Sequence, residues 1–314
     1  MVKTLVNGIN VHYQIKGDGP DVVLVHGLTS TLAVWYTTIL PALARDFRVT
    51  VYDLRGHGLT DLTPSGYTSR EMAEDLVALM DHVGVEKARV VGHSFGGSVG
   101  LHLALLHPDR VDGVVLSDTG LAALRHLRDL DKWKQWGGLL SKYGISYRWL
   151  RNAQKKGDIT DVIRKSFDIP QQFGFRKGAS RATPRLRRLI DETNVATEFR
   201  EVAGLTVERL PEVTAPVLAL YGETSPNKRM AAYLSAAMPN CRSEILPDFG
   251  HFYLVQDPDL FLNRITDFLH DPSAYVARGV PPAGNETRDR KADGPGSETS
   301  YEERSVLESF SLDR

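Results

Sequence analysis

The sequence has little of what several common classes of protein require. It contains a single cysteine, Cys241, so no disulfide can form within the chain, and no Cys/His cluster has the spacing of a zinc site. No apolar run approaches the roughly 18 residues that span a bilayer, and residues 1–8 lack the continuous apolar segment of a secretory signal. The formal net charge of -1 gives no overall attraction to nucleic acid or membrane. We therefore expect a cytoplasmic protein without metal, cofactor, nucleic-acid partner or membrane span.

The order of apolar segments predicts an α/β fold. The chain has 314 residues, of which 42% are hydrophobic and 25% charged, as in an ordinary soluble globular protein. Short runs rich in β-branched residues alternate with amphipathic helical stretches up to about residue 120 and again from about residue 206 to 270. This alternation is typical of a parallel sheet covered by helices. The pattern at Thr68 and Glu71 is that of a capping box and predicts the start of a helix extending to residue 82.

Two segments interrupt or follow this pattern. Residues 121–205 carry aromatic residues and leucines at helical spacings but no clear strand, and we interpret them as a helical cap inserted into one α/β core. Residues 271–314 are rich in Pro, Gly, Ser, Glu and Arg, which predicts a mostly disordered tail. The expected domains are therefore a core of residues 1–120 and 206–270, a cap of residues 121–205, and the tail.

The motif Gly92-His93-Ser94-Phe95-Gly96 is the strongest indication of chemistry. It lies between an expected strand and an expected helix, which is the setting of a nucleophile elbow. Such a turn exposes the serine hydroxyl at a helix N-terminus, where developing negative charge is stabilised. Ser94 is therefore the candidate nucleophile.

A serine nucleophile needs a base and donors for an oxyanion. His251 is the candidate base because it lies on a Gly-containing loop between the last expected strand and the last expected helix. The backbone N–H groups of Phe95 and Leu28 are the candidate oxyanion donors, since one follows the nucleophile and the other follows an early strand. We interpret His26, beside Leu28, as a residue that shapes this loop by hydrogen bonding.

Across about residues 1–270 the chain resembles the α/β-hydrolase family. The resemblance rests on motifs in matching order, which are His26-Gly27 with Trp35, Asp53-Leu54-Arg55-Gly56-His57-Gly58, the elbow around Ser94, His107-Pro108-Asp109-Arg110, and Gly250-His251. It implies a mostly parallel twisted sheet flanked by helices, with a helical cap insertion. It also implies that Asp53, Arg55 and Gly56 are structural.

The sequence departs from the family at the triad acid. Many members place it three residues after the glycine that ends the strand following the cap, but Ser225 occupies that position here. The resemblance offers a second location, after the strand that follows the elbow helix, where this chain has Asp118. We expect Asp118 to be the acid, with Glu223 as the alternative; if neither reaches His251, the protein is a dyad enzyme or a non-catalytic relative.

These residues predict a serine hydrolase of an ester, lactone or thioester of a small to medium apolar acyl substrate. The aromatic residues Trp133, Trp136 and Tyr147 of the expected cap are candidate substrate contacts. The cap is also basic, which would suit an acidic carrier or a coenzyme A thioester, although a solvated helix surface is the commoner explanation of such charge. A C–C bond hydrolase or cyclase, and a receptor-like relative with little turnover, remain alternatives.

Overall fold

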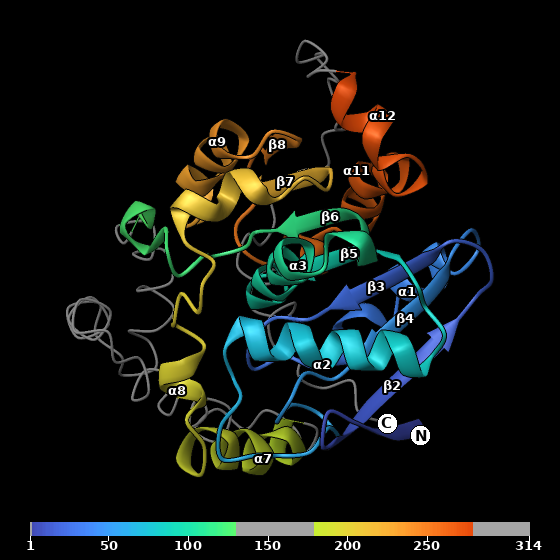
Figure 1. The fold of residues 1–314 in the computed structure, drawn as a ribbon, viewed down its shortest axis with the longest axis vertical. Helices are drawn as coiled ribbons and strands as arrows, with labels where there is room; N and C mark the ends of the chain where they lie inside the picture. The colour runs from blue at the N-terminus through green and yellow to red at the C-terminus, as the bar shows by residue number, and fades with distance from the viewer. Residues whose placement is uncertain (1, 130–178, 279–314) are drawn as a thin grey trace, which may run out of the picture.

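The computed structural model describes residues 2–129 and 179–278, and its centre is one sheet (Figure 1). The eight strands are β1 (Val2–Val6), β2 (Ile9–Lys16), β3 (Asp21–Val25), β4 (Arg48–Tyr52), β5 (Ala88–His93), β6 (Val111–Ser117), β7 (Val217–Gly222) and β8 (Cys241–Leu246). They lie in the order β1-β2-β4-β3-β5-β6-β7-β8. The six strands from β4 to β8 in this order are parallel, whereas β1 and β2 pair antiparallel. The predicted mostly parallel sheet is confirmed.

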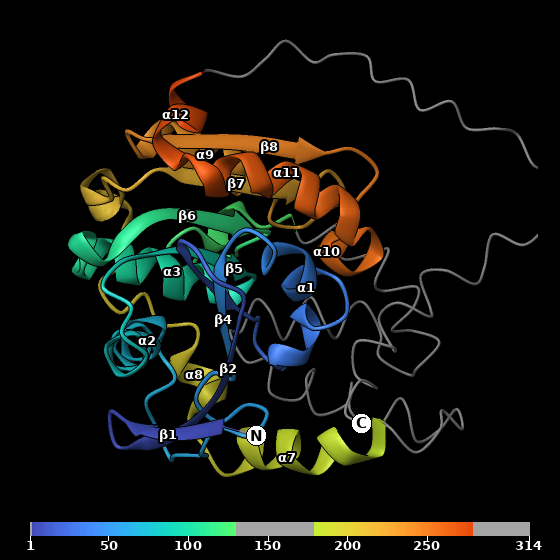
Figure 2. The same cartoon turned by 90° about the vertical axis from the view of Figure 1, so that its right-hand side faces the viewer.

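Helices cover both faces of the sheet. They are α1 (Ile39–Leu43), α2 (Ser69–His82), α3 (Phe95–Leu106), α7 (Ala179–Asp191), α8 (Val195–Glu198), α9 (Lys228–Ala237), α10 (Tyr253–Gln256), α11 (Pro258–His270) and α12 (Pro272–Ala277), with short 3-10 turns η1 (Leu32–Trp35), η2 (Pro108–Arg110), η3 (Arg125–Leu127) and η4 (Val207–Glu212). Figure 2 shows α2 and α3 on one face and α1, α10 and α11 on the other. Each layer closes its own apolar core against the sheet.

The central strands bury side chains on both faces, which explains their apolar sequences. In β3 the four residues after Asp21 are all buried, and in β6 every residue but Asp112 is buried. A strand covered on both faces needs apolar residues throughout rather than an alternating pattern. The carboxyl ends of these strands therefore form a rigid edge on which loops can hold polar side chains.

The helix predicted from the capping box begins where the sequence indicated. The Thr68 hydroxyl accepts a hydrogen bond from the Glu71 N–H, and the Glu71 carboxylate accepts one from the Thr68 N–H. This reciprocal pair satisfies two donors that the first turn of a helix leaves without intrahelical acceptors. The expected helix extending to residue 82 corresponds to α2.

The segment expected as a cap is described only in part. Helices α7 and α8 lie within it, and the Glu198 carboxylate at the end of α8 accepts hydrogen bonds from the N–H groups of Gly66 and Tyr67 just before α2. Trp133, Trp136 and Tyr147 lie outside the described residues, as do residues 279–314 of the expected tail. The chain remains folded past residue 270, where helix α12 begins at Pro272. Pro272 packs beside Gly113 of β6, which holds this helix against the sheet.

Candidate active site

Ser94 lies on a tight turn between β5 and α3. Its backbone has φ 53° and ψ -118°, a strained conformation for a residue with a side chain, and its N–H donates to the Ser117 carbonyl of the next strand at 2.8 Å. A Cβ on Gly92 would lie 2.4 Å from the Gly96 oxygen, and a Cβ on Gly96 would lie 2.2 Å from the Val25 oxygen. The two glycines are therefore required by close backbone packing, which holds the Ser94 turn in place.

Three side chains from three loops meet at this turn. The Nε2 atom of His251 lies 3.1 Å from Ser94 Oγ, and its Nδ1 atom lies 2.9 Å from Asp118 Oδ1. An ionised carboxylate can only accept, so Nδ1–H donates to Asp118 and the neutral imidazole keeps the lone pair of Nε2 for the serine hydroxyl. The structure thus brings Ser94, His251 and Asp118 together in the order nucleophile, base and acid.

The Asp118 carboxylate is completely buried and strongly hydrogen-bonded. Besides His251, the Ser225 hydroxyl donates to Oδ1 at 2.5 Å, the Asn227 side-chain amide donates to Oδ1 at 3.1 Å, and the Gly222 N–H donates to Oδ2 at 3.0 Å. Burial opposes ionisation of Asp118, but these bonds, led by that from His251, outweigh it and lower its pKa. The serine at the usual acid position therefore supports the carboxylate on the neighbouring strand.

Glu223, the alternative acid, has other partners. Its carboxylate accepts a hydrogen bond from the Asp248 N–H at 3.2 Å and lies 3.9 Å from Lys228 Nζ, and about half of its side chain is exposed. The structure places Asp118, rather than Glu223, against the His251 ring nitrogen that faces away from Ser94.

The two expected oxyanion donors border the serine. Phe95 is the first residue of α3, so its N–H has no acceptor within the helix. Gly27 packs so closely against the nucleophile that a Cβ there would lie 3.0 Å from Ser94 Cβ, which brings the backbone leading into Leu28 alongside the turn. The arrangement could present two backbone N–H groups to one oxygen atom.

Two buried imidazoles hold the loop that carries Leu28. His26 donates from Nδ1 to the Gly27 carbonyl at 2.8 Å and accepts the Leu54 N–H at Nε2, as the sequence interpretation expected. His57 accepts the Thr29 N–H at Nε2, 3.0 Å away, and burial lowers its pKa to about 3. Burial likewise lowers the pKa of His26. Both rings are therefore neutral, because each must accept as well as donate a hydrogen bond.

A third buried histidine supports the base. His93 Nε2 donates to the His251 carbonyl at 3.0 Å, and the two rings lie 4.9 Å apart between centroids. Burial, followed by the nearby His251, lowers the pKa of His93 to about 3. A neutral His93 can position His251 without repelling the imidazolium that catalysis would form. His93 lies inside the Gly92–Gly96 motif, but the motif itself gives no indication of this supporting role.

Behind the oxyanion loop, Asp53 has the structural role that the resemblance implied. Its carboxylate accepts hydrogen bonds from the Leu32 and Leu59 N–H groups and from His12 Nδ1 at 2.7 Å. His12 lies on β2 with 4% of its surface exposed. A carboxylate buried beneath the sheet edge needs a buried partner, and β2 provides one.

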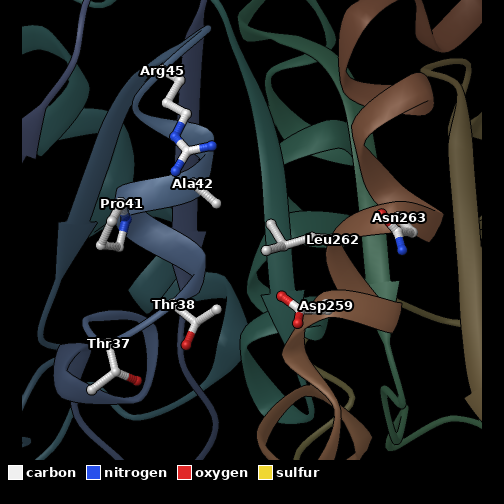
Figure 3. Close-up of a pocket in the computed structure, with 8 residues that line it drawn as sticks. All are labelled: Thr37, Thr38, Pro41, Ala42, Arg45, Asp259, Leu262 and Asn263. Carbon is white, nitrogen blue, oxygen red and sulfur yellow. The ribbon is translucent and has the colours of Figure 1, made fainter.

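The described residues also form a surface pocket that lies apart from this site. Figure 3 shows a surface pocket between α1 and α11, lined by Thr37, Thr38, Pro41, Ala42, Arg45, Asp259, Leu262 and Asn263. None of these residues belongs to the loops that carry Ser94, Asp118 or His251.

Within residues 2–129 and 179–278, no group of three His, Cys, Asp or Glu side chains could hold a metal ion, and no helix is long and apolar enough to cross a membrane.

Comparison with known proteins identifies the family to which this fold belongs. The model of the family described as "alpha/beta hydrolase fold" matches residues 20–258, and the chain belongs to this family. A protein of Stutzerimonas stutzeri named "Putative carbamate hydrolase RutD" is 39% identical over 281 residues, which cover 85% of this chain and 99% of that protein. A protein of the same name from Caulobacter sp. is 30% identical over 84% of this chain and 96% of its own length.

Solved structures show the same similarity. The structure titled "Est816 as an N-Acyl homoserine lactone degrading enzyme" has a TM-score of 0.62 and 26% sequence identity, covering 85% of this chain and all of that chain. The protein is therefore a hydrolase of the α/β fold. Its relatives include esterases, lactonases, carbamate hydrolases and an epoxide hydrolase. Membership of the family therefore does not determine which type of bond this protein hydrolyses.

Proposed function

We propose that the protein hydrolyses an ester, lactone or thioester of a small to medium apolar acyl substrate through an acyl-enzyme on Ser94. The observation that carries this proposal is the continuous hydrogen-bonded chain from Ser94 Oγ through His251 to Asp118. A serine hydroxyl is a weak nucleophile, and a neutral imidazole with its tautomer fixed by a buried carboxylate is the group that activates it.

In the first half of the reaction, His251 Nε2 takes the hydroxyl proton as Ser94 Oγ bonds to the carbonyl carbon. The carbonyl oxygen becomes an anion, and the N–H groups of Leu28 and Phe95 stabilise it. The tetrahedral species then collapses, the bond to the leaving group breaks, and the proton on His251 passes to the leaving oxygen or sulfur. The Asp118 carboxylate stabilises the imidazolium that exists between these two proton transfers.

In the second half, His251 removes a proton from a water molecule, whose oxygen bonds to the acyl carbon. Collapse of the second tetrahedral species breaks the bond to Ser94 Oγ, and His251 returns the proton to the serine. The acid is released and the enzyme regains its starting state. The proposal requires no metal or cofactor. Trp133, Trp136 and Tyr147 are proposed substrate contacts, on the sequence argument alone.

A carbamate is a second candidate substrate. The relative that is 39% identical over 85% of this chain is named for carbamate hydrolysis. A carbamate carbonyl can be attacked by the same serine and its oxyanion held by the same donors, so the chemistry of the site accommodates it. The difference would lie in the leaving group and in the stability of the carbamoyl intermediate.

Hydrolysis by the wild type and by Ser94→Ala tests the proposal directly. The substrates are 4-nitrophenyl hexanoate, an N-hexanoyl homoserine lactone, an acyl thioester and a 4-nitrophenyl carbamate, assayed at equal concentration. We expect Ser94-dependent turnover of at least one of the first three. Ser94-dependent turnover of the carbamate alone would select the second candidate, and binding of such compounds without turnover would favour the receptor-like alternative. Cleavage of a C–C bond in a vinylogous diketone, with esters left intact, would favour the C–C hydrolase alternative.

A further inference from the structure

Arg128 is a partly buried cation whose Nε atom is buried and lacks a hydrogen-bond partner among the described residues. It follows η3, and its Nη2 atom lies 3.4 Å from the Gly120 carbonyl oxygen, at the limit of a weak hydrogen bond. Its Nε atom is buried and has no hydrogen-bond partner, and no carboxylate of the described residues lies within ion-pair distance. Among the described residues, the Gly120 carbonyl oxygen is therefore the one hydrogen-bond acceptor found for a guanidinium that carries five N–H donors.

Two other largely buried arginines, Arg55 and Arg242, have carboxylate partners. Arg55 makes two hydrogen bonds to the Asp75 carboxylate, at 2.8 and 2.6 Å, and Arg242 lies 2.9 Å from Glu244 Oε1. A buried charge is costly unless an opposite charge and hydrogen bonds compensate for it. Arg128 thus differs from Arg55 and Arg242, since no carboxylate of the described residues compensates its charge.

The surroundings of Arg128 add to this cost. Burial lowers its pKa, and the positive charge of Arg200 lowers it further. An arginine side chain nevertheless stays protonated in proteins. The folded chain therefore maintains a positive potential at this point, and an anion entering it would gain both a charge and several donors.

The position of Arg128 connects it with the candidate active site. A Cβ on Gly120 would lie 2.6 Å from Arg128 Nη2 and 3.2 Å from the side-chain oxygen of Asn227, the residue whose amide also donates to Asp118. On the other side, Arg200 follows Phe199, whose ring packs edge-on against Phe95 at 6.2 Å between centroids. Arg128 thus lies beside the loop that carries Asp118, and Arg200 follows in sequence a residue whose ring contacts Phe95.

We infer that Arg128 binds an anionic group of the substrate, so that the enzyme prefers acyl substrates that carry a carboxylate or phosphate away from the scissile bond. The inference rests on the proposed function, because it names the class of compound that Ser94 would attack.

A matched pair of esters tests the inference. Mono-4-nitrophenyl adipate and 4-nitrophenyl hexanoate have the same acyl length and leaving group, and they differ only in a terminal carboxylate in place of a methyl group. The readout is the ratio of kcat/KM for the charged ester to that for the neutral ester. We expect a ratio well above one for the wild type and a fall of about 10-fold to 100-fold in Arg128→Gln, the range set by hydrogen bonds to charged groups.

Two further variants separate binding from general charge and from folding. Arg125→Gln removes an exposed arginine three residues away on the same turn, and it should leave the ratio within about twofold of the wild type. Arg128→Lys keeps the charge but loses the planar fork, so it should retain part of the preference. Because the readout is a ratio within one variant, a partly folded preparation lowers both rates and leaves the conclusion intact.

A second pair distinguishes the source of the anion. Hexanoyl coenzyme A carries phosphates, whereas the hexanoyl thioester of N-acetylcysteamine does not. An Arg128-dependent preference in this pair alone would assign the site to phosphate, and one in the ester pair alone would assign it to carboxylate. The inference is overturned if Ser94-dependent hydrolysis occurs and neither ratio changes in Arg128→Gln. Absence of any Ser94-dependent hydrolysis would instead refute the proposed function.

Discussion

Replacing Asp118 by asparagine tests the assignment of the acid most sharply. The substitution preserves size but removes the charge and turns one accepting atom into a donor. In the structure, Oδ1 accepts from His251, Ser225 and Asn227, and Oδ2 accepts from the Gly222 N–H. An asparagine amide must therefore point its NH₂ group at existing donors in either orientation.

The size of the effect follows from these contacts. If the amide nitrogen faces Gly222, the oxygen can still accept from His251, but the imidazolium loses its counter-charge. If it faces His251, the imidazole must invert its tautomer and present N–H to Ser94, so that it can no longer act as a base. Loss of the carboxylate from a Ser-His-Asp triad lowers kcat by about 10⁴-fold. We expect Asp118→Asn to lower kcat by about 10³-fold to 10⁴-fold, with a smaller change in KM.

A second substitution can return the charge from the neighbouring strand. Ser225 Oγ lies 2.5 Å from Asp118 Oδ1, so a carboxylate at position 225 would enter the same polar cluster. We expect Asp118→Asn combined with Ser225→Asp to recover at least 10-fold of the lost kcat. Ser225→Asp alone should be slower than the wild type near neutral pH, because two adjacent carboxylates share one proton.

The assay is steady-state release of 4-nitrophenol, with urea unfolding to confirm that each variant is folded. Glu223→Gln is the matched control, since it makes the same carboxylate-to-amide change at the alternative acid, and it should stay within about threefold of the wild type. A folded Asp118→Asn variant within about fivefold of the wild-type kcat would refute the reasoning. A loss in Glu223→Gln of the size expected for Asp118→Asn would transfer the role of acid to Glu223.

Three further outcomes follow from the described contacts. In Gly96→Ala the new Cβ would lie 2.2 Å from a backbone oxygen. This substitution should therefore abolish hydrolysis and lower the unfolding free energy by about 3 kcal/mol or more, the upper end of the cost of overpacking a core. The ester assay measures the first effect and urea unfolding the second. Asp75→Asn should cost about 3 to 5 kcal/mol in the same unfolding assay, because Arg55 would lose its buried counter-charge. In the folded chain the pKa values of His57 and His93 are lowered to about 3, whereas in the unfolded chain both have the ordinary value of 6.5. Below pH 6.5 the unfolded chain therefore binds protons that the folded chain does not, so the unfolding free energy should fall as the pH drops. Each histidine contributes about 2 kcal/mol of this loss between pH 7 and pH 5, and a flat profile over that range would contradict neutral, buried imidazoles.

Much of the parallel sheet could be predicted because its strands are buried on both faces. Apolar runs at residues 22–25, 48–52 and 111–116 belong to the alternating pattern before residue 120 and correspond to β3, β4 and β6, where burial on both faces favours apolar residues. Strands β1 and β2 were not identified individually. They lie at one end of the sheet, and their mixed burial, with Leu5 67% exposed, leaves a weaker pattern.

Some residues of the candidate site could be predicted from the sequence and others could not. Ser94 and His251 were predictable because backbone geometry and loop position require Gly-containing motifs around them. Ser225, Asn227 and His93 were not predicted to support them, because their roles depend on hydrogen bonds between segments far apart in the sequence. The absence of aspartate at position 225 was the one available signal, and it led to Asp118 without indicating that Ser225 donates to that residue.

The measurement that tests the central claim most directly is the intact mass of the protein after reaction with a fluorophosphonate. This reagent phosphonylates a serine only where a base activates it and donors stabilise the anion. We expect one adduct per chain on the wild type, located on Ser94 by peptide mapping, and none on Ser94→Ala or His251→Ala. A wild type that gains no mass, or an adduct that persists in Ser94→Ala, would contradict this expectation.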